Sequence, residues 1–163
     1  MRLISYIFKI LFLLFILIGS ACLATASTVD IRLDVKEFRL ENGMLFLVVE
    51  RPATPQVAVR LAIRAGSALE ETGKTGIAHL LEHMMFKGTE DTPAGKFSEI
   101  IAAHGGKENA FTSKDYTAYF QRISNDHLEL CLSLEADRMR NLLLNEEDFL
   151  KEVEVVKEER RLR

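Results

Sequence analysis

The spacing of apolar residues changes along this chain, and the change limits the folds open to it. Between residues 57 and 64 apolar side chains alternate with small or basic ones, as in an antiparallel strand with one buried face: Val57, Val59, Leu61 and Ile63. From residue 76 many apolar residues recur at the spacing of helices. Strands mixed with helices, without regular alternation of the two, predict an α+β fold in which an antiparallel or mixed sheet packs with helices.

The same patterns give the expected elements. A hairpin is expected between Ile31 and Glu50, around a Glu41-Asn42-Gly43 turn. The segments that follow predict two further short strands and four helices. These strands are expected at 109–112 and 117–122, and the helices at 76–86, 93–104, 126–144 and 146–163.

The first 26 residues have the pattern of a secretory signal. Arg2 and Lys9 lie near the start, Ile10 to Gly19 is an unbroken apolar run, and Ala24-Thr25-Ala26 offers a cleavage site of small residues. Residues 1–26 are therefore expected to be a signal peptide, with one domain in the remainder, 27–163. The protein is expected to be exported, to a periplasmic or extracellular location.

Two alternatives to a cleaved signal remain open. The apolar run could stay in the membrane as an anchor, although it reaches the required length of about 20 apolar residues only if Lys9 is counted. A lipid anchor on Cys22 is the other alternative. The preceding Gly19-Ser20-Ala21 lacks the large aliphatic residue that is usual three places before such a cysteine.

Composition excludes several classes of protein. The chain has 21 basic and 24 acidic residues of mixed order, for a net charge of −3, so no basic surface for nucleic acid is expected. Two cysteines cannot form a disulfide framework or a zinc finger of several thiolates. Cys131 lies where Leu128, Leu132 and Met139 recur at helical spacing, which is typical of a buried structural thiol. Any metal must therefore use histidine and carboxylate ligands.

A metal-binding pattern stands in the first expected helix, at His79-Leu80-Leu81-Glu82-His83. At 100° per residue, His79 and His83 lie about 40° apart, and Glu82 lies about 60° to the other side of His79. Two imidazoles on one face can bind zinc, and the glutamate between them can act on a water as general base. The pattern is the inverted zinc signature, and it predicts a metal site.

The last expected helix offers the third ligand that a catalytic zinc ion needs. Glu152 and Glu159 lie about 20° apart on its helical wheel and fall within an apolar arc, whereas Glu158 points away. A buried carboxylate is costly unless it is paired or bound to metal, so both glutamates need an explanation. The apolar arc consists of Phe149, Val153, Val155, Val156 and Leu162.

Seven stretches of the chain match, in order, the pattern of one known family. They are Gly66 to Glu70, Gly76 to Thr89, Gly105-Gly106, Asn109 to Ser113, Asp115, Thr117 to Phe120 and Glu152 to Arg161. This pattern resembles the N-terminal domain of pitrilysin/insulinase-type zinc peptidases, which include the mitochondrial processing peptidases. The resemblance covers nearly all of residues 35–163 and implies the LuxS/MPP-like metallohydrolase fold.

The resemblance also implies roles for individual residues. His79 and His83 would bind one zinc ion, and Glu82 would activate the water that attacks a peptide bond. The family's third ligand lies about 76 positions after the second histidine, which is Glu159 here. Glu152 matches a family glutamate that supports the site without touching the metal. The implied activity is that of a zinc-dependent metalloendopeptidase.

The resemblance further implies a substrate strand and a partner. The segment from Asn109 to Thr112 matches the edge strand along which the family's substrates, extended peptides or small unfolded proteins, add as a further strand. Asn109, Ala110 and Phe111 are the substrate-binding residues that the match implies. Family members pair this domain with a similar C-terminal half, in the same chain or in a second subunit, so a dimer is one expectation. The chain stops within a helical pattern and is therefore expected to be a fragment. The alternative function is that of a non-catalytic partner subunit of a two-chain peptidase.

Overall fold

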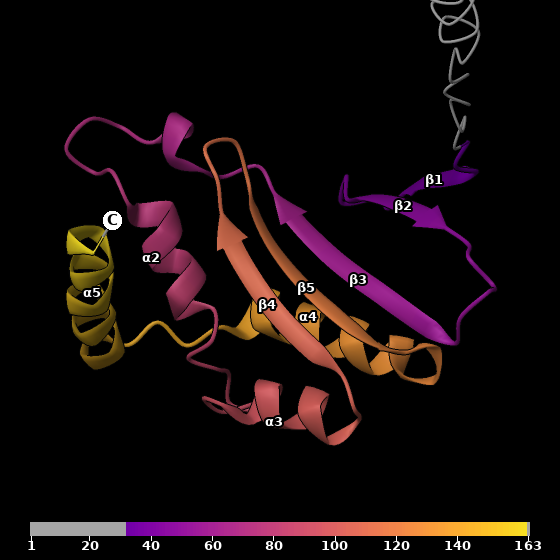
Figure 1. Ribbon diagram of the computed structural model, residues 1–163. Coiled ribbons are helices and arrows are strands. Elements are labelled where there is room, and N and C mark those ends of the chain that lie inside the picture. Colours follow the sequence, from indigo (N-terminus) through magenta and orange to yellow (C-terminus); the bar gives the residue numbers. More distant parts are fainter. Residues whose placement is uncertain (1–31, 163) are drawn as a thin grey trace, which may run out of the picture. The chain divides into compact units, whose positions relative to one another are not determined.

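The computed structural model describes residues 32–162 (Figure 1). The expected signal segment, 1–26, and its possible anchors lie outside these residues. The described part forms two compact units, one ending at Glu50 and one beginning at Arg51, and each is described by itself. Among the described residues, no helix has the length and apolar character needed to cross a membrane.

The first unit contains an antiparallel hairpin of β1 (Val35–Arg39) and β2 (Leu45–Val49). Phe38 and Phe46 are cross-strand partners, and their rings stack with centroids 4.7 Å apart. Gly43 has a φ of +88°, a left-handed conformation that favours glycine in the turn. The hairpin was expected from Ile31, but β1 begins at Val35, and Leu33 lies before it and is exposed.

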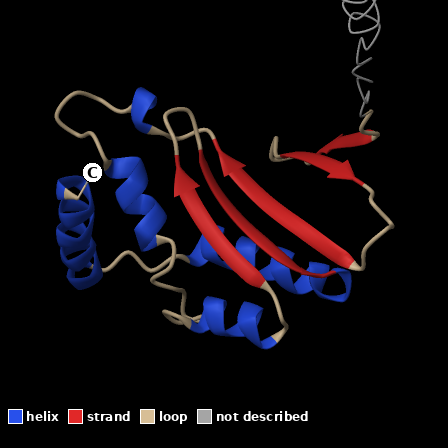
Figure 2. Cartoon of the chain, viewed as in Figure 1, coloured by secondary structure: helices blue, strands red, loops and turns tan. Residues whose placement is uncertain are grey.

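The second unit is built on a three-stranded antiparallel sheet in the order β3-β5-β4. Its strands are β3 (Gln56–Ile63), β4 (Lys107–Thr112) and β5 (Thr117–Ser124), and β5 is central (Figure 2). β3 alternates between exposed and half-buried residues as its sequence predicts. Within the described chain, β4 pairs only with β5 and so forms an edge.

The helices are shorter than the apolar spacing suggested, by a few residues at one or both ends. Short 3-10 turns occupy Ser67–Leu69 and Asn125–His127, so the helix expected from residue 126 begins two residues later. The α+β class with antiparallel sheets and helices is confirmed. The α-helices are α2 (Ile77–Met84), α3 (Lys96–Ala103), α4 (Leu128–Asn141) and α5 (Glu146–Arg161).

The core of the second unit lies where α3 and α4 meet the sheet. Its fully or nearly fully buried members come from both helices and from β5: Phe97, Ile101, Ile123, Cys131 and Leu134. The expected buried thiol is therefore confirmed, and burial raises the pKa of Cys131 above its ordinary value. Such a thiol is a structural rather than a reactive group.

The buried face of α4 differs from the one its apolar residues suggested. Leu128, Leu132 and Met139 are 41 to 48% exposed. The helix instead buries Glu135 and Arg138 one turn apart, where Arg138 donates to both carboxylate oxygens at 2.9 and 2.6 Å. The guanidinium also lies over aromatic rings, including that of Tyr119 at 4.4 Å. Mutual neutralisation and this cation–π contact allow two charged residues to be buried.

Candidate metal centre

Helix α2, which carries both motif histidines, is held at its start by a distant carboxylate. Gly76, at the N-cap position, has a φ of +100° and no side chain with which to cap the helix. Glu70 replaces the missing cap, because its two oxygens accept from the backbone N–H groups of Gly76 at 2.7 Å and Ala78 at 2.8 Å. A negative charge at this end also complements the helix dipole.

Helix α5 lies beside α2 and brings the third candidate ligand to the histidines (Figure 1). Asn145 caps it, since its side-chain oxygen accepts from the backbone N–H of Asp148 at 2.8 Å. Glu152 is only 8% exposed. Glu159 lies on the same inward face of the helix and is half-buried. The wheel thus placed both glutamates correctly.

The apolar arc of α5 is narrower than expected. Only Val153 and Val156 among its five apolar members are half-buried. Phe149, Val155 and Leu162 are 45%, 43% and 86% exposed, which corrects the expectation that they face inward. The inward face of α5 contacts α2 and is therefore built largely around its two carboxylates.

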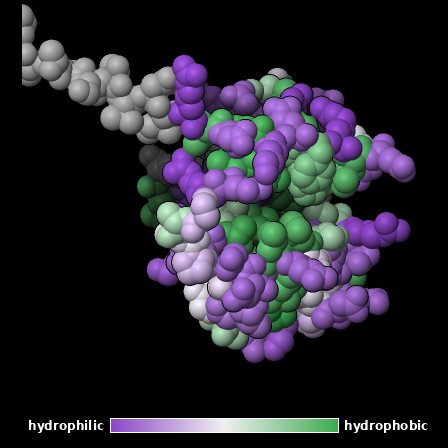
Figure 3. Space-filling view, turned by 90° about the vertical axis from the view of Figure 1, so that its right-hand side faces the viewer, coloured by the Kyte–Doolittle hydropathy of each residue, from purple (hydrophilic) through white to green (hydrophobic). Residues whose placement is uncertain are grey.

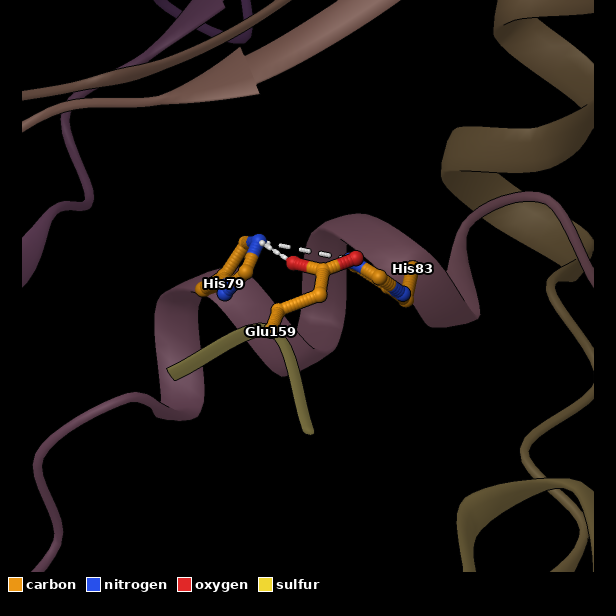
Figure 4. Close-up of side chains that lie close together, drawn as sticks. All are labelled: His79, His83 and Glu159. Carbon is orange, nitrogen blue, oxygen red and sulfur yellow. Dashed lines mark hydrogen bonds and ion pairs between the residues drawn. The ribbon is translucent and has the colours of Figure 1, made fainter. Parts of the chain in front are cut away.

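The three predicted metal ligands lie together between these helices (Figure 4). The Nε2 atoms of His79 and His83 are 3.3 Å apart. Glu159 places Oε2 at 3.4 Å from His79 Nε2 and Oε1 at 3.7 Å from His83 Nε2. All three residues are half-buried, so the cluster is accessible to solvent.

These distances can be compared with the geometry that zinc requires. Ligand atoms at 2.0 to 2.1 Å in a tetrahedron are separated from one another by roughly 3.3 Å. The two Nε2 atoms, 3.3 Å apart, match this value, and one ligand atom from each of the three residues lies within 4.8 Å of the other two. Two imidazoles and one carboxylate are also a donor set that zinc accepts, with a fourth position left for another ligand. The residues present therefore fit a zinc ion.

Glu152 contacts His83 through the ring nitrogen that faces away from the cluster, and it is not one of the three clustered residues. Its Oε2 lies 2.8 Å from His83 Nδ1, and its Oε1 forms an ion pair with Lys87 Nζ at 2.5 Å. Because a carboxylate only accepts, His83 must donate from Nδ1, which leaves the Nε2 lone pair available for a metal. Burial by itself raises the pKa of Glu152, but the hydrogen bonds from Lys87 and His83 outweigh burial and hold that pKa below its ordinary value.

Glu82, the predicted general base, points to the sheet rather than to α5. Its Oε2 accepts a hydrogen bond from the hydroxyl of Thr112, the last residue of β4, at 2.6 Å. Reasoning from the sequence did not identify Thr112 or Lys87 as site residues. Lys87 had a weak signal, since it follows the motif by one helical turn. Thr112 was expected in the edge strand, but it lies 30 residues from Glu82 and nothing in the sequence linked the two.

The predicted substrate residues lie on the edge strand that runs along α2. Asn109, Ala110 and Phe111 are consecutive in β4 and range from half-buried to exposed. Helix α2 contacts this strand, so the strand and the histidines belong to one region of the unit. The ring of Phe111 packs edge-on against Tyr116, with centroids 5.5 Å apart.

Comparison with known proteins identifies a family. The family model for insulinase, peptidase family M16, matches residues 45–162. The zinc protease PqqE of Helicobacter pylori is 43% identical over 125 residues, which are 76% of this chain and 28% of that protein. The crystal structure of a protease from Helicobacter pylori matches with a TM-score of 0.78 and 41% identity, over 81% of this chain and 32% of that one.

A solved structure of pitrilysin is also similar, with a TM-score of 0.66 and 29% identity over 77% of this chain and 13% of that one. The chain thus spans less than a third of the length of each of these relatives. The family resemblance read from the motifs is confirmed, because the family match covers most of the chain and the fold agrees. The chain belongs to the insulinase/pitrilysin family of peptidases, M16, in which its relatives include named zinc proteases.

Proposed function

We propose that this chain carries the zinc centre of a metalloendopeptidase that hydrolyses peptide bonds in extended peptides or small unfolded proteins. The observation that carries the proposal is the cluster of His79, His83 and Glu159, in which one ligand atom from each residue lies within 4.8 Å of the other two. Two helices distant in sequence bring these atoms together, which is hard to explain without a shared ligand. One zinc ion is the ligand that this donor set suits.

The chain's own residues would divide the chemistry as follows. A zinc ion held by the three ligands polarises a carbonyl oxygen and makes water more acidic. Glu82 takes a proton from the attacking water and delivers it to the leaving amine, so it acts first as a base and then as an acid. Glu152 keeps the proton of His83 on Nδ1. The edge of β4, at Asn109, Ala110 and Phe111, would offer backbone groups to an extended peptide, for which the Ala110 N–H would exchange the hydrogen bond that it donates to Asn109 Oδ1 at 2.8 Å.

The complete enzyme would need more than this chain. The relatives are more than three times as long as the segment matched here. Several large apolar side chains are also exposed in the described part, and Figure 3 shows such residues at the surface among hydrophilic ones. We propose that a homologous C-terminal half, in the same chain or in a second subunit, completes the enzyme. Export through residues 1–26 is part of the same proposal.

Zinc content tests the metal site. The parent protein should bind about one zinc ion per chain, and Glu159→Gln should bind it much more weakly, because the amide cannot supply an anionic ligand. Glu158→Gln is the matched control, since Glu158 is its exposed neighbour on α5 and should leave binding unchanged. Metal analysis of dialysed, folded samples gives the result. Equal zinc binding by all three proteins would contradict the ligand assignment.

Turnover tests the role of Glu82. In the full-length protein, Glu82→Gln should keep its zinc and lose peptide hydrolysis by a factor of at least a hundred, because the amide cannot accept the proton of water. Cleavage of a quenched fluorescent peptide measures this. Hydrolysis that persists in the variant would remove Glu82 from the mechanism. Zinc binding by a parent without any turnover would favour the non-catalytic partner subunit.

A further inference from the structure

One side chain links the edge strand to the predicted general base. Thr112 ends β4, directly after the three proposed substrate residues, and its hydroxyl donates to Glu82 Oε2 at 2.6 Å. Side chains alternate along a strand, so Thr112 shares the face of Ala110 rather than that of Phe111. It therefore reaches α2 from the strand that the substrate is proposed to join.

The direction of the hydrogen bond between Thr112 and Glu82 follows from the chemistry of the two groups. A carboxylate accepts only, so Thr112 must be the donor to Glu82. The hydroxyl of Thr117 lies 3.1 Å from that of Thr112 and 2.8 Å from the carbonyl oxygen of Ala65, to which it donates. The hydroxyl of Thr112 thus has a fixed acceptor in Glu82 and a polar neighbour on its other side. No other described residue donates a hydrogen bond to Glu82, which leaves its Oε1 open.

The backbone that carries Thr112 is held on both sides. The turn after β4 closes with a bond from Ser113 N to Tyr116 O at 2.9 Å. The segment after β3 is bound to the same turn, since Ala68 N donates to Lys114 O at 2.9 Å. A Cβ at Gly66 would lie 2.5 Å from Lys114 O, so this close approach requires glycine. A β-branched side chain on such a backbone has little rotational freedom.

We propose that Thr112 is a positioning residue of the peptidase reaction. Its hydroxyl fixes the Glu82 carboxylate through Oε2, so that Oε1 is the oxygen that accepts the proton of the attacking water. The inference rests on the proposed function and deepens it. Strand β4 would then have two roles, because it binds the substrate and also orients the general base, Glu82.

The test removes the hydroxyl while keeping the shape of the side chain. Thr112→Val in the zinc-loaded, full-length protein should lower kcat by about ten to a hundred times and leave KM within about twofold, because a misplaced base slows the chemical step without altering the backbone contacts of β4. Thr112→Ser keeps the donor and should restore most of kcat. Zinc content and the circular dichroism spectrum should match those of the parent.

Thr89 provides a matched control. Its hydroxyl also donates to a carboxylate at 2.6 Å, that of Asp137, but outside the candidate site. Thr89→Val should therefore keep kcat even if it lowers stability. A second test combines variants: in the Glu82→Gln background, adding Thr112→Val should not reduce the residual turnover further, because Thr112 acts through Glu82.

The outcomes separate this inference from the proposed function. A parent without peptide hydrolysis overturns both. A parent that is active, with a Thr112→Val variant of equal kcat or with a loss confined to KM, overturns only the role of Thr112. The same holds if Thr112→Val reduces the residual turnover of Glu82→Gln by its full factor. If Thr112→Val does not fold, Thr112→Ala and Thr112→Ser are compared in the same assay, and equal kcat values contradict the proposal.

Discussion

Glu152 shows how one residue can join the two helices of the metal centre. It lies on α5, yet both of its partners, His83 and Lys87, come from α2 and the turn that follows. The positive charge of Lys87 and the hydrogen bond from His83 offset the free-energy cost of burying the carboxylate of Glu152. We therefore expect the half-buried Lys87 to support the site through Glu152.

Replacing Lys87 tests this arrangement. Lys87→Met should weaken zinc binding by about tenfold, because a half-compensated Glu152 holds His83 less firmly and the outer partners of metal ligands commonly contribute this much. Competition with a fluorescent chelator at neutral pH measures the affinity. Lys151→Met is the control, since Lys151 pairs with Glu147 at an exposed site of α5. Equal zinc affinities for the parent and Lys87→Met would show that Glu152 positions His83 without the ion pair to Lys87.

The residues of the site differ in how far the sequence could reveal them. His79, Glu82 and His83 form a local pattern, and Glu159 could be placed because a wheel and the family spacing agree. The roles of Thr112 and Lys87 were missed because they depend on contacts between separate elements. A threonine hydroxyl or a lysine charge is common on any surface, so only the folded structure distinguishes these two.

At the scale of elements, α2 depends on a carboxylate outside the helix. Glu70 binds two of the N–H groups that a helix start leaves without partners. Glu70→Gln keeps one acceptor but loses the charge, so it should destabilise the fold by about 1 kcal/mol, as for the loss of a capping residue. The amides of residues 77–84 should exchange faster with solvent. Hydrogen exchange followed by mass spectrometry measures both effects.

A neighbouring glutamate serves as the control for this prediction. Glu71 pairs only with Lys74 on an exposed turn, at 2.8 Å, and Glu71→Gln should leave exchange in α2 unchanged. Equal protection of α2 in the Glu70→Gln variant would show that packing alone sets the start of this helix.

The elements themselves were predicted better than their buried faces. Turn residues and apolar spacing located every strand and α-helix of the described part to within a few residues, but not the 3-10 turn at Ser67–Leu69. The inward face of α4 was predicted from apolar residues alone, and it also carries Glu135 and Arg138. On α5 the two glutamates were predicted to face inward, as they do, but Phe149, Val155 and Leu162 are exposed. A pattern of hydrophobicity cannot reveal that Glu135 and Arg138 neutralise each other, or that Glu152 and Glu159 face histidines.

At the scale of the whole second unit, one carboxylate ties the turn after α2 to α4. Asp137 accepts from the hydroxyl of Thr89 at 2.6 Å and from Asn141 at 2.9 Å. These hydrogen bonds, that of Thr89 first, hold the pKa of Asp137 below its ordinary value. A lowered carboxyl pKa means that folding favours the ionised form. Its stabilising contribution is present above pH about 4 and is lost as the pH falls through the lowered pKa.

The stability of the protein should therefore decline on acidification, and Thr89→Val should reduce the share due to Asp137. The difference in urea midpoint between parent and variant should be larger at pH 6 than at pH 3, where the carboxyl group becomes protonated. Thr89→Ser should behave like the parent. A difference that is the same at both pH values would mean that the threonine acts through packing.

The separation of the proposed metal ligands along the chain has a consequence for the order of synthesis. Glu159 is made 76 residues after His83. A nascent chain can form α2 with both histidines, but it has no third ligand until α5 has left the ribosome. Closing so long a segment also carries an entropic cost that only a packed unit can offset. Tight metal uptake would then have to wait for the synthesis of α5.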